Sequence, residues 1–130
     1  MSSSEPNDRR ATGEQIVREM FGEEFLQKNM LAAANSEGPG ADIARLALEQ
    51  CFGDVWSRPG LDRRSRSLVT LGVLMAQGHH WEVRNHVLGG LANGLTPSEI
   101  LEAVLQAVPY IGLPAAGQAM GAAARAIDEA

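Results

Sequence analysis

The sequence predicts an all-α protein, and three observations lead to that fold class. Apolar residues recur at intervals of three and four along most of the 130 residues, which is the period of a helix with one buried face. No stretch alternates apolar and polar residues with the β-branched enrichment of a strand. Glycine, proline and asparagine separate the periodic stretches, where they end helices. We therefore expect about six helices and no sheet.

The first half of the chain begins with a polar segment and continues with helical stretches. Residues 1–12 are expected to form a flexible N-terminus, and one folded domain is expected to span residues 13–130. Residues 13–20 and 23–34 are predicted helices, and the first buries Ile16, Val17 and Met20. Residues 36–40, with two glycines and a proline, interrupt the chain. From residue 42 onward, four residues recur at helical spacing and predict the next buried face: Ile43, Leu46, Ala47 and Cys51.

The second half carries clearer helix signals. Residues 65–77 are apolar on nearly every side, which predicts a helix buried on most sides. Residues 80–92 form another predicted helix, ended by the Asn93-Gly94 pair. Residues 96–99 form a capping box with proline at the first helical position, which opens a further helix. The last predicted helix starts at Leu113-Pro114 and is rich in alanine and glycine, so that another helix can approach it closely.

Composition excludes several classes of protein. The net charge of −5 does not suit a nucleic-acid partner, which requires a clustered basic surface. The one local basic cluster, Arg63, Arg64 and Arg66, fits a helix start with salt bridges in an oligomer, or a site for an anionic substrate. Cys51 is the only cysteine, so no intrachain disulfide can form, and we interpret it as a packed residue. Without a signal peptide or a membrane-spanning stretch, the expected location is the cytoplasm.

Two features predict self-association rather than a monomer. One is an almost wholly apolar helix in so short a chain, and the other is the small-residue face of the last helix. Small domains bury a limited fraction of their surface, and association supplies the missing burial.

His86 is the strongest candidate for chemistry. Glu82 lies four residues before it and Asn93 seven residues after it, so the three share one helix face. Histidine titrates near neutrality, and a neighbouring carboxylate orients the ring and raises its pKa. The same spacing also describes a structural histidine that is hydrogen-bonded to Glu82. His79 with Glu82 and His86 gives three potential metal ligands, but this spacing is not the usual one for zinc, and we expect no metal site.

Five blocks of sequence, in order and in register, resemble the 4-carboxymuconolactone decarboxylase family. They are residues 53–61, 66–70, 82–86, 93–96 and 110–116. The resemblance implies an α-helical fold like that of alkylhydroperoxidase D, assembled as a homotrimer or homohexamer. It also implies a reaction that needs neither cofactor nor metal. The peroxidase branch of this superfamily carries a Cys-x-x-Cys pair, and the matching positions here are His80 and Val83, which excludes sulfur redox chemistry.

The resemblance also assigns roles to individual residues. His86 becomes the proton donor, with Glu82 tuning it. The cations available to hold a substrate carboxylate are Arg58, Arg66 and Arg84. Tyr110 donates to an enolate or anchors the turn that follows it. His80 and Trp81 are expected at the rim of the pocket, where the family usually carries charged residues.

Two departures bear on the substrate. Leu88 and Gly117 stand where the family usually carries arginine and asparagine, and Gly89-Gly90 is expected to widen the helix face. These changes favour a larger, less charged substrate. The first hypothesis is decarboxylation of a carboxylated γ-lactone such as 4-carboxymuconolactone, in aromatic catabolism. The second is decarboxylation, isomerisation or dehydration of another enolisable ring substrate in a biosynthetic pathway. The third is a non-catalytic helical oligomer.

Overall fold

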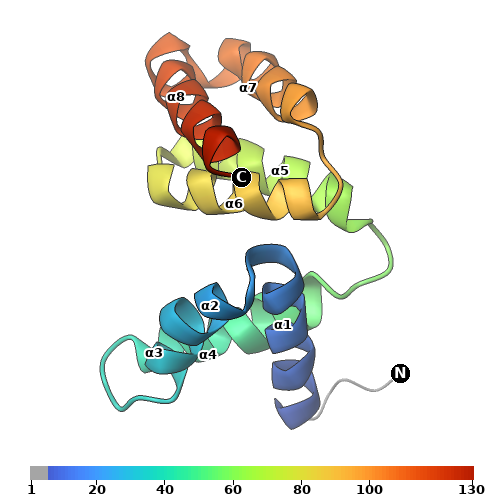
Figure 1. Ribbon diagram of the computed structural model, residues 1–130, viewed down its shortest axis with the longest axis vertical. Helices are drawn as coiled ribbons and strands as arrows, with labels where there is room; N and C mark the ends of the chain where they lie inside the picture. Colours follow the sequence, from blue (N-terminus) through green and yellow to red (C-terminus); the bar gives the residue numbers. More distant parts are fainter. Residues whose placement is uncertain (1–5) are drawn as a thin grey trace. The chain divides into compact units, whose positions relative to one another are not determined.

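Every regular element that the computed structural model describes, over residues 6–130, is helical (Figure 1). The all-α prediction is confirmed. The chain divides into two compact units, Met1–Gly60 and Leu61–Ala130, which are described separately below. In chain order the elements are α1 (Pro6–Phe21), α2 (Glu23–Phe25), η1 (Leu26–Leu31), α3 (Ala32–Ala34), α4 (Ala41–Leu46), η2 (Ala47–Val55), α5 (Arg63–Gln77), α6 (His80–Ala92), α7 (Pro97–Ile111) and α8 (Leu113–Glu129), with η1 and η2 π-helical. Among residues 6–130, no helix is long and apolar enough to cross a membrane.

The first helix begins earlier than the sequence predicted. Residues 1–5 of the expected flexible segment lie outside the described residues, but α1 already starts at Pro6 rather than at residue 13. Two side-chain contacts account for the extra turns. Arg10 Nε donates to Glu14 Oε2 one turn later at 3.1 Å, and Arg9 Nη1 donates to Asp54 Oδ2 at 3.1 Å. The second contact ties the start of α1 to η2.

In the first unit, α1 packs against η2 with almost no side-chain material between the two backbones. A Cβ atom on Gly13 would lie 1.8 Å from the carbonyl oxygen of Leu48, and one on Gly53 would lie 2.4 Å from the carbonyl oxygen of Arg9. No side chain fits at either position, since real Cβ contacts are never so short. Two glycines therefore set the distance between α1 and η2.

The core of the first unit confirms one predicted face and corrects another. Ile16, Val17 and Met20 of α1 are buried, as expected. On α4 and η2 the predicted face is wrong: Ile43 is 70% exposed, and Cys51 is exposed rather than packed. The buried positions there are spaced by four: Ala44, Leu48, Phe52 and Trp56. The observed face keeps this helical spacing but is shifted by one residue, from Ile43, Ala47 and Cys51 to Ala44, Leu48 and Phe52.

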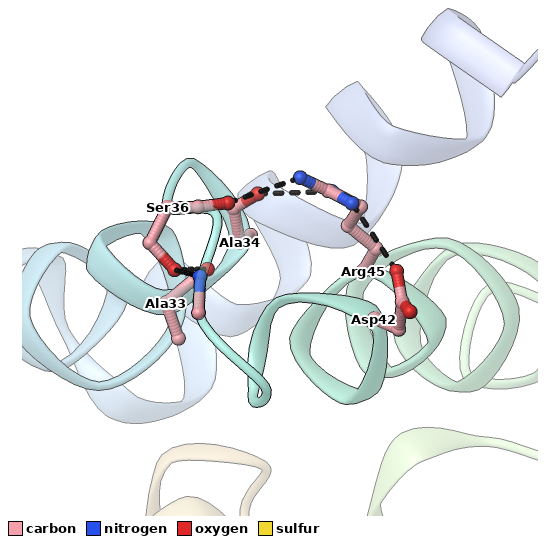
Figure 2. Close-up of polar contacts among 6 residues, drawn as sticks. Ala33, Ala34, Ser36, Asp42 and Arg45 are labelled. Carbon is pink, nitrogen blue, oxygen red and sulfur yellow. Dashed lines mark hydrogen bonds and ion pairs between the residues drawn. The ribbon is translucent and has the colours of Figure 1, made fainter.

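Arg45 closes the loop between α3 and α4, as Figure 2 shows. Its Nε atom donates to the carbonyl oxygen of Ala34 at 3.0 Å, and its Nη2 atom donates to that of Ser36 at 3.3 Å. Its Nη1 atom contacts Asp42 Oδ1 at 3.2 Å, which holds the guanidinium in place. The predicted break at residues 36–40 is thus a loop, and one side chain, Arg45, satisfies the carbonyl oxygens of Ala34 and Ser36 at its start.

The second unit is built from four helices. In it α6 packs against α5 and α8, and α7 packs against the same two helices. The predicted capping box opens α7: Glu99 N donates to Thr96 Oγ1 at 3.1 Å, and Thr96 N donates to Glu99 Oε1 at 2.9 Å. Asn93 follows the last residue of α6, so the predicted end of that helix is also confirmed.

Two features expected to serve self-association are placed differently. The alanines that face inward from α8 lie in the core of the second unit, so this small-residue face is used within the chain: Ala116, Ala119, Ala122, Ala123 and Ala126. On α5, Leu71 and Met75 are buried, but Val69 and Val73 are 60% and 49% exposed. The helix is therefore not buried on most sides in the single chain.

Candidate functional site

His86 lies in the middle of α6 and is buried, with 8% of its surface exposed. The adjacent Asn85 and, on α5, Ser67 are buried polar residues as well. Burial lowers the pKa of His86 from 6.5 to about 4, because removal of water disfavours the charged imidazolium. At neutral pH the ring of the single chain is therefore uncharged.

Glu82 makes a hydrogen bond to a neighbour on α6 in the single chain. Its side chain is exposed, and Oε1 accepts a hydrogen bond of 3.5 Å from Nδ2 of Asn85. The expectation that Glu82 raises the pKa of His86 is wrong for the single chain, where burial lowers it. The i, i+4 spacing brings the two residues to one side of α6, but it does not show which of them faces water.

A polar contact that the sequence did not reveal joins α5 and α6 on the His86 face. Asn93 Nδ2 donates to Ser67 Oγ at 3.0 Å, and Ser67 has no exposed surface. His86, Gly90 and Asn93 follow one another at i, i+4 and i+7, which places them along one side of the helix. Ser67 is 26 residues from Asn93 in the sequence, and helical periodicity does not predict contacts between residues so far apart.

Gly90 does not widen this face, contrary to the expectation. A Cβ atom there would lie 3.0 Å from Cδ1 of Leu95 and 3.7 Å from Cβ of Ser67, so the space is already filled. Gly117 is the opposite case: a Cβ atom there would meet nothing within 4 Å. Leu88 is half-buried and packs against the core of the second unit. Of these positions, only Gly117 borders open space.

Three of the predicted site residues meet at the contact between α6 and α8. Arg84 binds Glu129 through two hydrogen bonds, Nη2 to Oε1 at 2.5 Å and Nε to Oε2 at 3.3 Å. Its guanidinium carbon lies 5.3 Å from the centre of the Trp81 ring. These residues line a hollow of about 180 Å³, here called the α6–α8 pocket: His80, Trp81, Arg84, Ala122, Arg125 and Glu129. Arg125 and Glu129 escaped the sequence reasoning, because the last helix was interpreted through its small residues alone.

The remaining predicted residues are spread over both units. Arg58 belongs to the first unit and is exposed. Arg66 lies in the first turn of α5, where its Nε donates to the carbonyl oxygen of Leu61 at 3.0 Å. Tyr110, near the end of α7, is 81% exposed. Arg66 and Tyr110 belong to the second unit, as His86 does.

A second hollow runs along α5 and α7 and has a volume of about 890 Å³. We call it the α5–α7 groove. Its floor is mostly apolar and includes Val69 and Val73, while Tyr110 lies at its edge. Arg64 and Glu99, which form an ion pair, also line it. His86 lines neither this groove nor the α6–α8 pocket.

The chemistry available at His86 is proton transfer by a buried imidazole. Its low pKa keeps it neutral until an anion arrives nearby, and an anion raises the pKa of a histidine. Among residues 6–130, no group of three or more histidine, cysteine, aspartate or glutamate side chains is placed to hold a metal ion.

Comparison with known proteins agrees with these features. Residues 41–125 match the carboxymuconolactone decarboxylase family. A nitrosuccinic acid decarboxylase of Metarhizium robertsii is 37% identical over 134 residues, covering 99% of this chain and 92% of that protein. A 4-carboxymuconolactone decarboxylase of Acinetobacter baylyi is 37% identical over 108 residues, covering 83% and 78%. The predicted resemblance is confirmed, and so is the expectation of a decarboxylase of this kind. The chain belongs to the carboxymuconolactone decarboxylase family.

Proposed function

We propose that this protein decarboxylates a small carboxylic acid whose reacting carbon is conjugated to, or bears, an electron-withdrawing group, and that His86 supplies the proton. The observation that carries this proposal is a buried histidine inside the stretch that matches the family.

The two relatives act on different acids that share one chemical property. In 4-carboxymuconolactone, the electron pair left by CO₂ is delocalised through a double bond onto the lactone carbonyl. In nitrosuccinic acid, a nitro group can take the same pair. In each case a C–C bond breaks, CO₂ leaves, the pair moves onto oxygen, and one proton is then added to carbon. The protein has to orient the leaving carboxylate, stabilise the oxyanion and deliver that proton.

The low pKa of His86 suggests how the proton arrives. In the free chain the ring is neutral at pH 7. An anionic substrate bound beside it raises the pKa, so the ring takes up a proton from solvent as the substrate binds. The protonated ring then donates to the carbanion carbon. In this proposal the charge of the substrate tunes His86, in place of Glu82.

A cation for the substrate carboxylate is proposed among Arg58 and Arg66, and Tyr110 is proposed as a donor to the oxyanion. Leu88 stands where the family usually carries arginine, which favours an acid other than the dianionic lactone. The similarity to a nitrosuccinic acid decarboxylase over 99% of the chain makes nitrosuccinic acid the alternative substrate to test first.

The experiment measures CO₂ release from nitrosuccinic acid and from 4-carboxymuconolactone. His86→Gln is expected to lower turnover of the accepted acid by about 10²–10⁴-fold, the usual contribution of a positioned acid or base. Circular dichroism checks that the variant is folded, and His79→Gln, an exposed histidine, is the matched control. Full activity in His86→Gln would refute the assignment of His86.

The same assay tests the substrate. If the lactone is turned over poorly by the wild-type protein and better by Leu88→Arg, the departure at this position determines specificity. Efficient wild-type turnover of the lactone would restore the plain 4-carboxymuconolactone decarboxylase assignment.

A further inference from the structure

We infer that the α6–α8 pocket is a binding site for a planar carboxylate, separate from His86, and that Glu129 occupies its cationic centre when no ligand is bound. Residues 84 and 86 lie about 200° apart around a helix of 3.6 residues per turn, so Arg84 and His86 face different sides of α6. The inference therefore stands whether or not the proposed reaction is correct.

Arg84 is already arranged to hold a carboxylate. Its guanidinium already holds a carboxylate by two hydrogen bonds, at 2.5 and 3.3 Å, which is the arrangement by which arginine recognises carboxylates. The ring of Trp81 lies against the guanidinium at 5.3 Å, a cation–π contact that keeps it in place. A fork held in position loses little freedom when it exchanges one carboxylate for another.

The charged groups that line the pocket carry an excess of positive charge. They are two guanidinium groups, of Arg84 and Arg125, and one carboxylate, that of Glu129. Arg125 acts on that carboxylate only through its charge, whereas Arg84 also donates hydrogen bonds. An excess of positive charge in a pocket of a chain with net charge −5 favours a second anion.

Two helix ends meet at the pocket. It includes His80 and Trp81, the first two residues of α6, where the helix carries partial positive charge that favours a carboxylate. Glu129 is the last residue of α8 and lies at a helix end, where side chains fray and can leave Arg84 to a ligand.

Size and shape then limit the ligand. A volume of about 180 Å³ equals roughly six water molecules at ~30 Å³ each, which admits a small acid. The Trp81 ring is 57% exposed and offers flat apolar surface beside the cations. A planar acid that carries an aromatic or conjugated group satisfies both the guanidinium groups and the indole.

The test is a calorimetric titration of the whole protein with sodium benzoate at constant ionic strength, with neutral benzamide as the matched ligand. Benzoate is expected to bind and benzamide is not. Arg84→Gln and Arg125→Gln are each expected to weaken benzoate binding about tenfold or more, the worth of a hydrogen bond to a charged group. Arg84→Lys keeps the charge but loses the fork, so it should also weaken binding, and circular dichroism confirms that each variant is folded.

Glu129→Gln provides the sharper test. It removes the internal competitor and is expected to tighten benzoate binding roughly two- to fivefold, the range of one exposed ion pair. Asp128→Asn removes the same charge one residue away, outside the pocket, and is expected to leave affinity unchanged. His86→Gln is also expected to leave it unchanged.

Three results would overturn the inference. One is the absence of benzoate binding in both the wild type and Glu129→Gln. Another is an equal response to Glu129→Gln and Asp128→Asn. The third is a parallel loss of binding in His86→Gln, which would make the pocket part of the His86 site.

Discussion

Burial of His86 makes the folded chain sensitive to mild acid. The pKa of the ring is 6.5 in an unfolded chain and about 4 in the folded one. As pH falls below 6.5, the unfolded state takes up a proton and the folded state does not, so the free energy of unfolding decreases until about pH 4. The difference amounts to about 3 kcal/mol, from 1.36 kcal/mol per pKa unit.

We therefore expect His86→Gln to lose less stability between about pH 7 and pH 4.5 than the wild type, in urea unfolding followed by circular dichroism. Carboxylates contribute to acid sensitivity in both proteins, so the comparison isolates the histidine. His79→Gln should follow the wild-type curve. Parallel curves for the wild type and His86→Gln would show that the ring is solvated in the folded protein.

For single residues of the candidate site, the sequence predicted which residues matter but not which side chains surround them. His86 was found from its spacing and from the family blocks. Its burial, and hence the direction of its pKa shift, depends on the helices packed against α6, of which α5 precedes it and α8 follows later in the chain. Arg84 was likewise found, but Glu129 is 45 residues away, and no periodicity links them.

Helix ends were easier to predict than helix faces. The capping box at Thr96 and the break at residues 36–40 are local signals, and the structure confirms both. The buried face of α4 and η2 was placed one residue too early, because apolar residues stand at both sets of positions and periodicity alone does not distinguish Ile43 and Ala47 from Ala44 and Leu48. The start of α1 was placed too late because Arg9 is held by Asp54, a residue of a different helix.

Because α1 and η2 lie so close together, replacing a glycine at their contact by alanine should destabilise the protein. Gly53→Ala would place a methyl group 2.4 Å from the carbonyl oxygen of Arg9, so the helices must separate. We expect the free energy of unfolding to fall by about 1–3 kcal/mol, the range for overpacking. A Cβ atom on Gly117, in α8, would meet nothing within 4 Å, so Gly117→Ala should instead raise the free energy of unfolding by up to about 1 kcal/mol.

Thermal and urea unfolding of the two variants measures this contrast. If Gly53→Ala were as stable as the wild type, the close approach of the two backbones would not exist in solution. A loss of stability in Gly117→Ala would show that the gain at an open position is offset by a contact with another chain.

At the scale of the whole molecule, self-association to a trimer or hexamer stays a prediction, but its expected surface has changed. The small residues of α8 are buried inside the second unit, whereas Val69, Val73 and Tyr110 along the α5–α7 groove are exposed. Exposed apolar side chains gathered in one groove are typical of a surface that another protein covers. We propose that a second copy of this chain contacts the groove.

Light scattering is expected to give a mass several times 13.9 kDa for the wild-type protein. Val73→Glu should shift the population toward monomer, because a buried carboxylate without a partner is costly at an interface. Gln77→Glu adds the same charge to an exposed position of the same helix and should leave the mass unchanged. Ala122→Leu should destabilise the second unit rather than its assembly. A clean monomer at micromolar concentration would contradict the proposal.

The prediction of one domain over residues 13–130 was made from chain length, which does not show where contacts are dense. The described structure divides at Gly60, after the Pro59-Gly60 pair. The family match over residues 41–125 includes α4 and η2 of the first unit and most of the second. That the two units act as one domain stays a prediction.

The close contact between α1 and η2 at Gly13 and Gly53 can form only after both segments have been synthesised. Gly13 is synthesised 40 residues before Gly53, which takes about 2–8 s at 5–20 residues per second. During this interval the side of α1 that carries Gly13 has no η2 backbone to meet. Ile16, Val17 and Met20 are synthesised 33–37 residues before Gly53 and pack in one core with residues of η2, so a chain that ends before residue 53 cannot complete this core.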